Sequence, residues 1–476
     1  MKRKVLIGFF WKFGEQLSSQ MVSFVLSIIL ARLLSPADYG VVALVNVFIV
    51  IADVFVTSGF GTSLIQKKDS DETDFSTIFY LSEIVSIIIY LLIFISAPWI
   101  AKFYNNSQLT LILRVFALKL PLSAFNGIQQ AYISKHLMFE KVFVSTTIAA
   151  ILSGIIGISM AYLDCGVWSL IAQYLSNTIF ISVTLAAQIK WYPRWRFSWK
   201  AGKPLLDFGW KMLVTDLLGQ IFNQLRSLIL GKVYTSADLA YYNRGQRFPD
   251  LVSTNIDGTL STVLFPTMSK YNDDLDEIKK ITRKSIRTST FVIMPLLFGM
   301  AATSRPIVLM LLTKKWIATV PLMQILCFSD AFDTVSNTNM QALKAVGRSD
   351  ILLKLELIKK PIYLFLLVIG IKISIYAVAY TMVVYNVLAV LINMAPNRKL
   401  LNYSFIEQLS DILPALLNSI LMYCVVMLST YIIKAPLLII FILQIFIGIS
   451  TYIFMANIFK MDAFNDIIKI LDRKIK

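Results

Sequence analysis

The stretch Ser27-Ile28-Ile29-Leu30-Ala31-Arg32 returns two hundred residues later as Ser227-Leu228-Ile229-Leu230-Gly231-Lys232. The flanking dipeptides that repeat with it are Trp11-Lys12 with Trp210-Lys211, and Ala37-Asp38 with Ala237-Asp238. Both copies open long apolar segments. A duplicated apolar pattern predicts a membrane protein of two similar halves, and transporters commonly bind their substrate where such halves meet.

The composition predicts an all-α polytopic membrane protein. The chain of 476 residues is 57% hydrophobic and 15% charged, with a mean hydropathy of +0.70. An average soluble domain is about 45–50% apolar and about 25% charged. Apolar stretches of roughly 20 residues, each long enough to cross about 30 Å of hydrocarbon, recur along the whole chain. We count fourteen transmembrane helices, and the least distinct division, between the eleventh and twelfth, falls near Gly370–Lys372.

The distribution of positive charge predicts the orientation. With the N-terminus in the cytoplasm, the predicted inner segments hold 28 of the 45 Lys and Arg residues, and the outer segments hold eight. Cytoplasmic loops are enriched in Lys and Arg, so we expect a multi-pass protein with both termini in the cytoplasm. The same enrichment accounts for the net charge of +17, and we expect no nucleic-acid partner.

The two copies are predicted to be parallel repeats, because six spans separate them and both therefore begin on the same side. A second echo supports this, since Asn126 with Gln130-Ala131 matches Asn337 with Gln341-Ala342. We expect the two bundles to surround a central cavity. The predicted parts are an N-terminal six-helix bundle at 1–200, a C-terminal six-helix bundle at 201–395, and two additional transmembrane helices with a basic amphipathic cytoplasmic tail at 396–476.

Polar side chains inside apolar helices predict that this cavity is wet. A charge at mid-bilayer costs roughly 2.5–3.5 kcal/mol on insertion scales, so such residues should face a cavity or a partner. The first and fourth predicted helices of each half carry polar residues at helical spacing. At matching positions of the fourth helices, the first half has Lys119 and the second has Asp330. The polar residues expected to line the cavity or couple an ion are Glu15, Asp216, Asp330, Asp333, Asn126, Gln130, Gln220, Asn223, Asn337 and Gln341.

These stripes have two interpretations. Their uncharged members could equally hold packed helices together by hydrogen bonds. Their cations suit a phosphate or pyrophosphate, held by charge-assisted hydrogen bonds, and their amides suit sugars. The candidate substrate-binding cations are Lys119, Arg226, Lys211, Arg114, Arg32 and Arg305, of which the last three could instead snorkel to the span ends. The acidic members could take up H⁺ or bind Na⁺ as a coupling ion, or could pair with nearby cations.

Several chemistries find no support in the sequence. There is no G-x-x-x-x-G-K-[ST] phosphate loop, and no G-x-S-x-G or H-E-x-x-H motif. Cys165, Cys327, Cys424 and the single histidine His136 fit no metal-ligand spacing. We therefore expect a secondary transporter rather than an enzyme, with no catalytic residues, no bound metal and no cofactor besides a coupling ion.

Two segments carry a family resemblance. Ala31-Arg32-Leu33-Leu34-Ser35-Pro36-Ala37-Asp38-Tyr39-Gly40 resembles the Wzx-type polysaccharide exporters of the multidrug/oligosaccharidyl-lipid/polysaccharide superfamily. Ala237-Asp238-Leu239-Ala240-Tyr241-Tyr242-Asn243-Arg244 is similar to the colanic-acid and teichuronic-acid branch of that family. The span number and the plan of two bundles agree with the resemblance over nearly the whole chain.

The resemblance implies a flippase in the bacterial cytoplasmic (inner) membrane. Such proteins move undecaprenyl-diphosphate-linked oligosaccharides between leaflets by alternating access, for exopolysaccharide, lipopolysaccharide O-antigen or teichuronic-type polymers. The implied partners are the lipid-linked oligosaccharide, membrane lipids, and a polysaccharide polymerase with its export machinery. One alternative is a multidrug or cation antiporter of the same superfamily. Another is a membrane-embedded glycan polymerase or ligase, although such enzymes usually carry a large outer loop with catalytic Arg or His.

Overall fold

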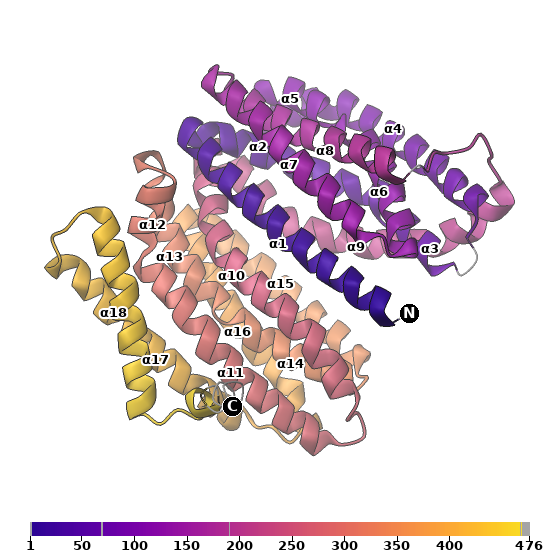
Figure 1. Cartoon of the computed structure of the whole chain (residues 1–476). Coiled ribbons are helices and arrows are strands. Elements are labelled where there is room, and N and C mark those ends of the chain that lie inside the picture. The colour runs from indigo at the N-terminus through magenta and orange to yellow at the C-terminus, as the bar shows by residue number, and fades with distance from the viewer. Residues whose placement is uncertain (1, 68–69, 190, 467, 469–476) are drawn as a thin grey trace. The chain divides into compact units, whose positions relative to one another are not determined.

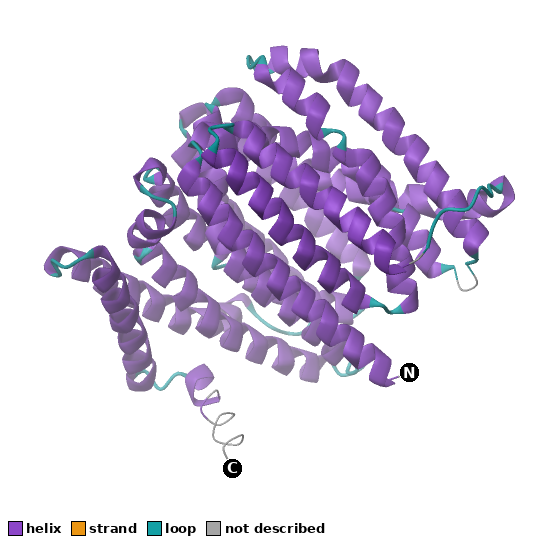
Figure 2. Ribbon diagram, turned by 45° about the horizontal axis from the view of Figure 1, so that its top comes forward, coloured by secondary structure: helices purple, strands orange, loops and turns teal. Residues whose placement is uncertain are grey.

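The computed structural model describes residues 2–67, 70–189, 191–466 and 468. Within these ranges the chain consists of helices joined by short loops and contains no strand (Figure 2). The predicted all-α polytopic fold is confirmed, and each of the fourteen predicted spans coincides with one helix or with two consecutive helices. The division predicted near Gly370–Lys372 falls at Ser374, whose hydroxyl caps the next helix.

The chain divides into two compact units, 1–240 and 241–476. This division groups the first helix of the second repeat with the N-terminal unit. The predicted boundaries at 200 and 395 mark the sequence repeats rather than the compact units. These boundaries stay predictions.

In its described residues the first unit contains nine complete helices, which Figure 1 shows. They are α1 (Lys2–Leu33), α2 (Pro36–Thr57), α3 (Phe60–Gln66), α4 (Glu72–Phe103), α5 (Gln108–Phe116), α6 (Lys119–His136), α7 (Phe139–Tyr162), α8 (Val167–Ile189) and α9 (Trp199–Val233). Helix α9 packs against α2, α3 and α4, and α1 packs against α7. The first helix of each predicted repeat, α1 or α9, therefore packs against other helices of the first unit.

The second unit begins within α10 (Ser236–Ser269). The elements after it are α11 (Leu275–Ala302), α12 (Ser304–Leu311), the 3₁₀ turn η1 (Lys314–Trp316), α13 (Thr319–Asp330), α14 (Asp333–Ala345), α15 (Ser349–Ile373), α16 (Ile375–Leu400), α17 (Phe405–Ile432) and α18 (Leu437–Ile458). The predicted tail follows α18. Residues 462–466 of it are helical, whereas 467 and 469–476 lie outside the described residues.

Among the described residues, nine spans are long and apolar enough to cross a membrane by length and composition. These nine include the broken span α5–α6. The predicted spans that fall short correspond to α1, α9, α10, α13–α14 and α15. All five contain acidic side chains along their length, which lowers their hydropathy.

The fourth span is interrupted in both halves. The first copy breaks between α5 and α6, and the second breaks between α13 and α14. At each break the N–H of an alanine is shared between two carbonyls, those of Leu113 and Val115 for Ala117, and those of Cys327 and Ser329 for Ala331. A shared bond of this kind tightens a helical turn. The duplication thus preserves a backbone feature that only the first copy marks with a proline, Pro121, whose ring is incompatible with a helical hydrogen bond to the Ala117 carbonyl.

The repeated dipeptides Ala37-Asp38 and Ala237-Asp238 lie in the first turns of α2 and α10. The Ser35 hydroxyl accepts a hydrogen bond from the Asp38 N–H at 3.2 Å, and the Asp38 carboxylate accepts from the Ser35 N–H at 3.0 Å. Thr235 and Asp238 make the same reciprocal pair, at 3.2 Å in each direction. Such capping boxes satisfy two backbone donors that a helix leaves without partners.

Two glycines permit close contacts of α2. A Cβ atom on Gly40 would lie only 1.7 Å from the carbonyl oxygen of Ser236. Gly59, between α2 and α3, has φ +84°, and a Cβ there would lie 2.3 Å from the carbonyl oxygen of Gly209. The starts of α2 and α10, which are equivalent in the repeat, therefore touch through backbone atoms.

A charged cluster attaches α17 to α11 in the second unit. The side chain of Asp411 is fully buried and accepts hydrogen bonds from Arg283 at 2.8 Å, Arg287 at 2.6 Å and the Tyr403 hydroxyl at 2.7 Å. Burial and the neighbouring Asp411 carboxylate raise the pKa of Tyr403, so its hydroxyl remains a donor. A buried carboxylate with three donors fixes the first of the two additional helices on the second bundle.

We expect Gly40→Ala to lower the thermal unfolding temperature of the detergent-purified protein. Its methyl group would overlap the Ser236 backbone, and overpacking of this kind costs about 1–3 kcal/mol. The matched control is Gly14→Ala, because a Cβ at Gly14 meets nothing within 4 Å. Tryptophan fluorescence during heating measures both variants, and equal unfolding temperatures would contradict the close contact.

Candidate functional site

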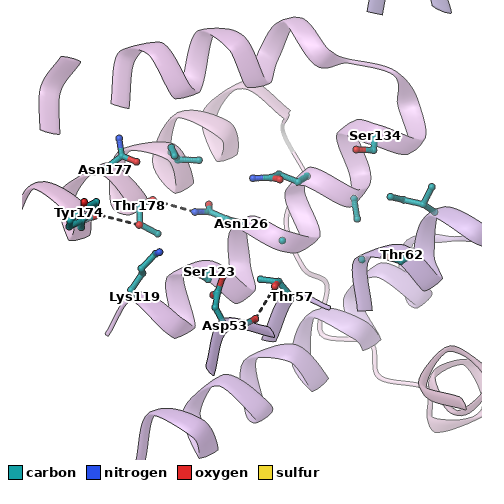
Figure 3. A pocket seen from close by; sticks show the side chains of 16 residues that line it. Asp53, Thr57, Thr62, Lys119, Ser123, Asn126, Ser134, Tyr174, Asn177 and Thr178 are labelled. Atoms are coloured by element: carbon teal, nitrogen blue, oxygen red, sulfur yellow. Dashed lines mark hydrogen bonds between the residues drawn. The ribbon is translucent and has the colours of Figure 1, made fainter. Parts of the chain in front are cut away.

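A polar cavity of about 520 Å³ lies within the first unit, between α2, α3, α6 and α8 (Figure 3). Side chains from all four helices line it. Its lining residues are Asp53, Thr57, Gly61, Thr62, Ile65, Lys119, Ser123, Asn126, Gly127, Gln130, Ala131, Ser134, Tyr174, Asn177, Thr178 and Ile181. A cavity with one cation, one carboxylate and several amides and hydroxyls can bind a charged group and orient a polar ligand.

The break before α6 places the single cation of this cavity. Lys119 is the first residue of α6, and its ammonium points into the cavity (Figure 3). Asp53 on α2 lies close enough to interact electrostatically with Lys119, and it also neighbours Ser123. Within the described part of the chain, the buried Oδ1 of Asp53 has no hydrogen-bond partner and Lys119 forms no ion pair. The Lys119 ammonium therefore retains capacity for a ligand.

The two amides of the α6 stripe have different environments. Asn126 is buried and binds α8, donating to the Thr178 carbonyl at 3.4 Å and accepting from the Ser182 hydroxyl at 2.8 Å. Gln130, one turn further on, is exposed to the cavity. Asn126 thus serves helix packing as well as lining the cavity, whereas Gln130 is available to a ligand.

The matching stripe of the second unit faces α10. Thr334 donates to the Asp257 carboxylate at 2.7 Å, and Gln246 donates to both Asp250 at 2.8 Å and Asp330 at 3.0 Å. Asp333 lies near the same carboxylates. The stripe therefore belongs to an acid-rich polar network between α10 and α13–α14.

The amides of this second stripe hold helices together. Asn337 donates to the Ser261 hydroxyl at 3.1 Å. Gln341 donates to the same hydroxyl at 3.0 Å and to the side-chain oxygen of Asn337 at 3.1 Å. For these two residues the structure shows interhelical hydrogen bonds, the packing interpretation of the stripe.

The two networks are built at equivalent positions. Ser123 and Thr334 are separated by the same interval as the Asn126 and Asn337 echo, and each neighbours a carboxylate from the second span of its half. Lys119 and Asp330 are separated by that interval too. The duplicated scaffold therefore carries a cation beside a carboxylate in one half and clustered carboxylates in the other.

The remaining predicted site residues lie elsewhere. Arg114 on α5 donates to the Phe94 carbonyl at 3.1 Å, with its guanidinium 4.2 Å from the centre of the Phe94 ring, so it contacts α4 rather than the cavity. Exposed candidates outside the cavity lining are Arg32, Arg305, Lys211, Asp216 and Asn223, and half-buried ones are Glu15, Gln220 and Arg226. Their functional roles stay predictions.

Sequence analysis missed three carboxylates that the structure places in these networks. They are Asp53, Asp250 and Asp257. Asp53 is the only charged residue of α2 beyond its first turn, so a search for charges inside apolar spans would have found it. Asp250 and Asp257 lie inside the predicted eighth span and satisfy the same criterion.

The sequence of this chain matches a known family. The family described as polysaccharide biosynthesis protein matches residues 29–321. The chain belongs to this family. It is 24% identical over 349 residues to the succinoglycan biosynthesis transport protein ExoT of Rhizobium meliloti (strain 1021), covering 73% of this chain and 71% of ExoT. It is also 24% identical over 304 residues to the teichuronic acid biosynthesis protein TuaB of Bacillus subtilis (strain 168), covering 63% of each chain.

The fold of this family member is also that of solved transporters. The lipid II flippase MurJ, in an inward closed conformation, superposes with a TM-score of 0.77 over 97% of this chain and 100% of MurJ, at 16% identity. An inward-facing multidrug resistance MATE family transporter of the MOP superfamily superposes with a TM-score of 0.63 over 81% of this chain and 94% of its own, at 14% identity. The predicted family is confirmed by the family match and the relatives. The solved structures, at identities this low, show the shared fold alone.

We expect the first-unit cavity to be hydrated. In a background with Cys165, Cys327 and Cys424 replaced by alanine, Lys119→Cys and Gln130→Cys should react with a charged, water-soluble methanethiosulfonate. Leu120→Cys is the control, because Leu120 neighbours Lys119 on α6 and is fully buried. Mass spectrometry of the labelled protein measures the reaction. Failure of both cavity cysteines to react, in the presence and absence of lipid extract, would contradict a hydrated cavity.

Proposed function

We propose that this protein is a flippase for undecaprenyl-diphosphate-linked oligosaccharides, acting in the export of an exopolysaccharide, O-antigen or teichuronic-type polymer. The observation that carries the proposal is Lys119, a cation that forms no ion pair in the described residues and points into a polar cavity inside an apolar helical bundle. An ammonium in such a place is costly unless it meets water or an anion. A diphosphate joined to sugars supplies both the anion and the polar surface.

The cavity chemistry fits the two ends of such a head group. The Lys119 ammonium would donate charge-assisted hydrogen bonds to phosphate oxygens. The Gln130 amide would donate to and accept from sugar hydroxyls. The polyprenyl chain would remain in the bilayer, so no free energy would be needed to move it into water. Alternating access between inward-open and outward-open states would then carry only the head group across.

The acid-rich network of the second unit is the proposed coupling element. Gln246 on α10 donates to Asp330, and Thr334 on α14 donates to Asp257 of α10, so a charge change at Asp330 or Asp257 alters a hydrogen bond between α10 and α13–α14. Uptake of H⁺ or Na⁺ there would bias the packing of α10, which is how an ion gradient could drive one conformation. The carboxylates of this network would bind a cation, whereas Lys119 of the first unit would bind the anionic head group.

The setting follows from the same proposal. We infer that the protein lies in the cytoplasmic (inner) membrane with both termini in the cytoplasm, and that it works beside a polymerase and its export machinery. Its substrate and the surrounding lipids would be its direct partners. We infer a transporter without catalytic residues, consistent with the transport function named for ExoT.

The alternative is an antiporter of drugs or cations. The fold shared with the MATE transporter and the carboxylates of the second unit favour it. Lys119 opposes it, because an ammonium in the first-unit cavity repels a cationic substrate. The two functions therefore differ in what the loss of this ammonium should do.

We expect Lys119→Gln to reduce flipping of lipid-linked oligosaccharide by about 10- to 100-fold, because hydrogen bonds to charged groups contribute about 1.5–3 kcal/mol. Lys119→Arg should retain most activity. Lys102→Gln is the control, since Lys102 is an exposed cation at the end of α4. The measurement is accumulation of inner-leaflet lipid-linked oligosaccharide in a deletion strain complemented with each variant. Undiminished flipping by Lys119→Gln, or a gain of cationic-drug export, would favour the antiporter.

We expect Asp330→Asn to abolish stimulation of flipping by an imposed H⁺ or Na⁺ gradient while leaving slow, gradient-independent flipping. The amide can still accept from Gln246, so the packing of α10 against α13 should persist. Ser329→Ala, at the neighbouring position, controls for local disturbance. Reconstituted vesicles with opposed gradients measure the effect. Equal stimulation of wild type and Asp330→Asn would remove this carboxylate from the coupling proposal.

A further inference from the structure

A second polar cavity, of about 340 Å³, lies where three helix ends of the first unit meet. Asp38 comes from the start of α2, Gln108 from the start of α5, Asp164 from the turn between α7 and α8, and Trp168 from the first turn of α8. In the predicted topology all three of these ends face the outside of the cell. The cavity is therefore separate from the Lys119 cavity in both its residues and its helix ends.

The backbone between α7 and α8 fixes the shape of this cavity. Asp164 and Gly166 adopt positive φ values of 55° and 53°, which turns the chain tightly between α7 and α8. A Cβ on Gly166 would lie 3.4 Å from the Oδ1 of Asp38, so the turn packs against the start of α2. The other oxygen of Asp38, Oδ2, accepts from the Ser35 N–H at 3.0 Å and from the Ser35 hydroxyl at 2.6 Å. The capping box thereby orients Asp38 and leaves Oδ1 at the cavity.

The polar groups of this cavity are mostly acceptors. No cation lines it, and within the described residues neither the Asp164 carboxylate nor the Gln108 side chain has a hydrogen-bond partner. Carboxylates accept hydrogen bonds from hydroxyls, and an amide both donates and accepts. The Trp168 indole supplies a flat apolar face with a polar N–H. Two carboxylates without a cation repel phosphates and uronates, so the cavity discriminates against anions.

We propose that this cavity is an outer-face binding site for a neutral sugar unit of the translocated glycan. Sugar hydroxyls would donate to Asp38 and Asp164, and the apolar face of the ring would stack on Trp168. The proposal rests on the proposed function. It adds a division of labour, in which Lys119 binds the diphosphate and the outer cavity binds uncharged sugar. Holding a distal sugar at the outer face raises the effective concentration of the glycan there and favours release outward.

Direct binding tests the site without requiring transport. Saturation-transfer NMR on the purified protein in nanodiscs would use glucose, galactose, N-acetylglucosamine and glucuronate as probes. We expect signal from at least one neutral sugar, a loss of at least fivefold of that signal in Trp168→Ala and in Asp164→Asn, and none from glucuronate. Trp195→Ala is the matched control, because Trp195 is an exposed tryptophan outside this cavity. Asp164 is exposed, so its variant tests the site even if Trp168→Ala disturbs folding.

Cys165 supplies a second measurement, because it lines the cavity. In a Cys327→Ala, Cys424→Ala background, a membrane-impermeant maleimide added outside intact cells should alkylate Cys165, and the bound neutral sugar should slow the reaction. Absence of binding by every neutral sugar, equal binding by Trp168→Ala and wild type, or equal binding of glucuronate would overturn the proposal. Binding of Ca²⁺ alone, lost in Asp164→Asn, would instead assign a cation site.

The two proposals fail separately. Sugar binding that depends on Trp168, together with normal flipping by Lys119→Gln, would leave the outer site intact and contradict the proposed function. Lys119→Gln should itself leave sugar binding unchanged, because Lys119 does not line the outer cavity.

Discussion

A polar side chain inside a membrane-spanning helix needs either water or a partner, and this requirement organises both halves of the molecule. In the first unit, the polar face of α6 meets α2 and α8, through Asp53 and through the hydrogen bonds of Asn126. In the second unit, the polar faces of α13 and α14 meet α10 and α16. Asn386, for example, donates to the Ser329 hydroxyl at 3.0 Å. The fourth span of each half is thus fixed by polar contacts to the second and sixth spans.

Duplication preserved this scaffold while the charges on it diverged. Two backbone features recur in both halves: the capping boxes at Ser35 and Thr235, and the break in the fourth span. The capping boxes recur because the first N–H groups of each helix need hydrogen-bond acceptors. Side chains facing a cavity are under no such constraint. One position holds Lys119 in the first half and Asp330 in the second, so a single geometric plan accommodates a cavity with a cation and an acid-rich network.

The sequence was sufficient for the helical fold and for placing the predicted spans on helices, because hydropathy reports these directly. The parallel repeat, inferred from exact local echoes, stays a prediction. The sequence indicated Lys119 and Gln130 because charged and amide side chains inside apolar spans are costly unless they face a cavity or a partner. It could not show that Arg114 contacts Phe94, since helical spacing leaves the direction of a long side chain open. Pro121, whose ring is incompatible with a helical hydrogen bond to the Ala117 carbonyl, was the unused signal for the break that sets Lys119 at a helix start.

The two interpretations of the polar stripes divide residue by residue. Asn337 and Gln341 make interhelical hydrogen bonds, so packing explains their presence, whereas Asn126 makes such bonds and also lines the first-unit cavity. No such contact explains Lys119, which remains a cation in a cavity without an ion pair among the described residues. The fold cannot decide what such a cavity carries, because it is shared by a lipid II flippase and a multidrug transporter. The sign of the charge at this position is therefore the feature that favours an anionic head group over a cationic drug.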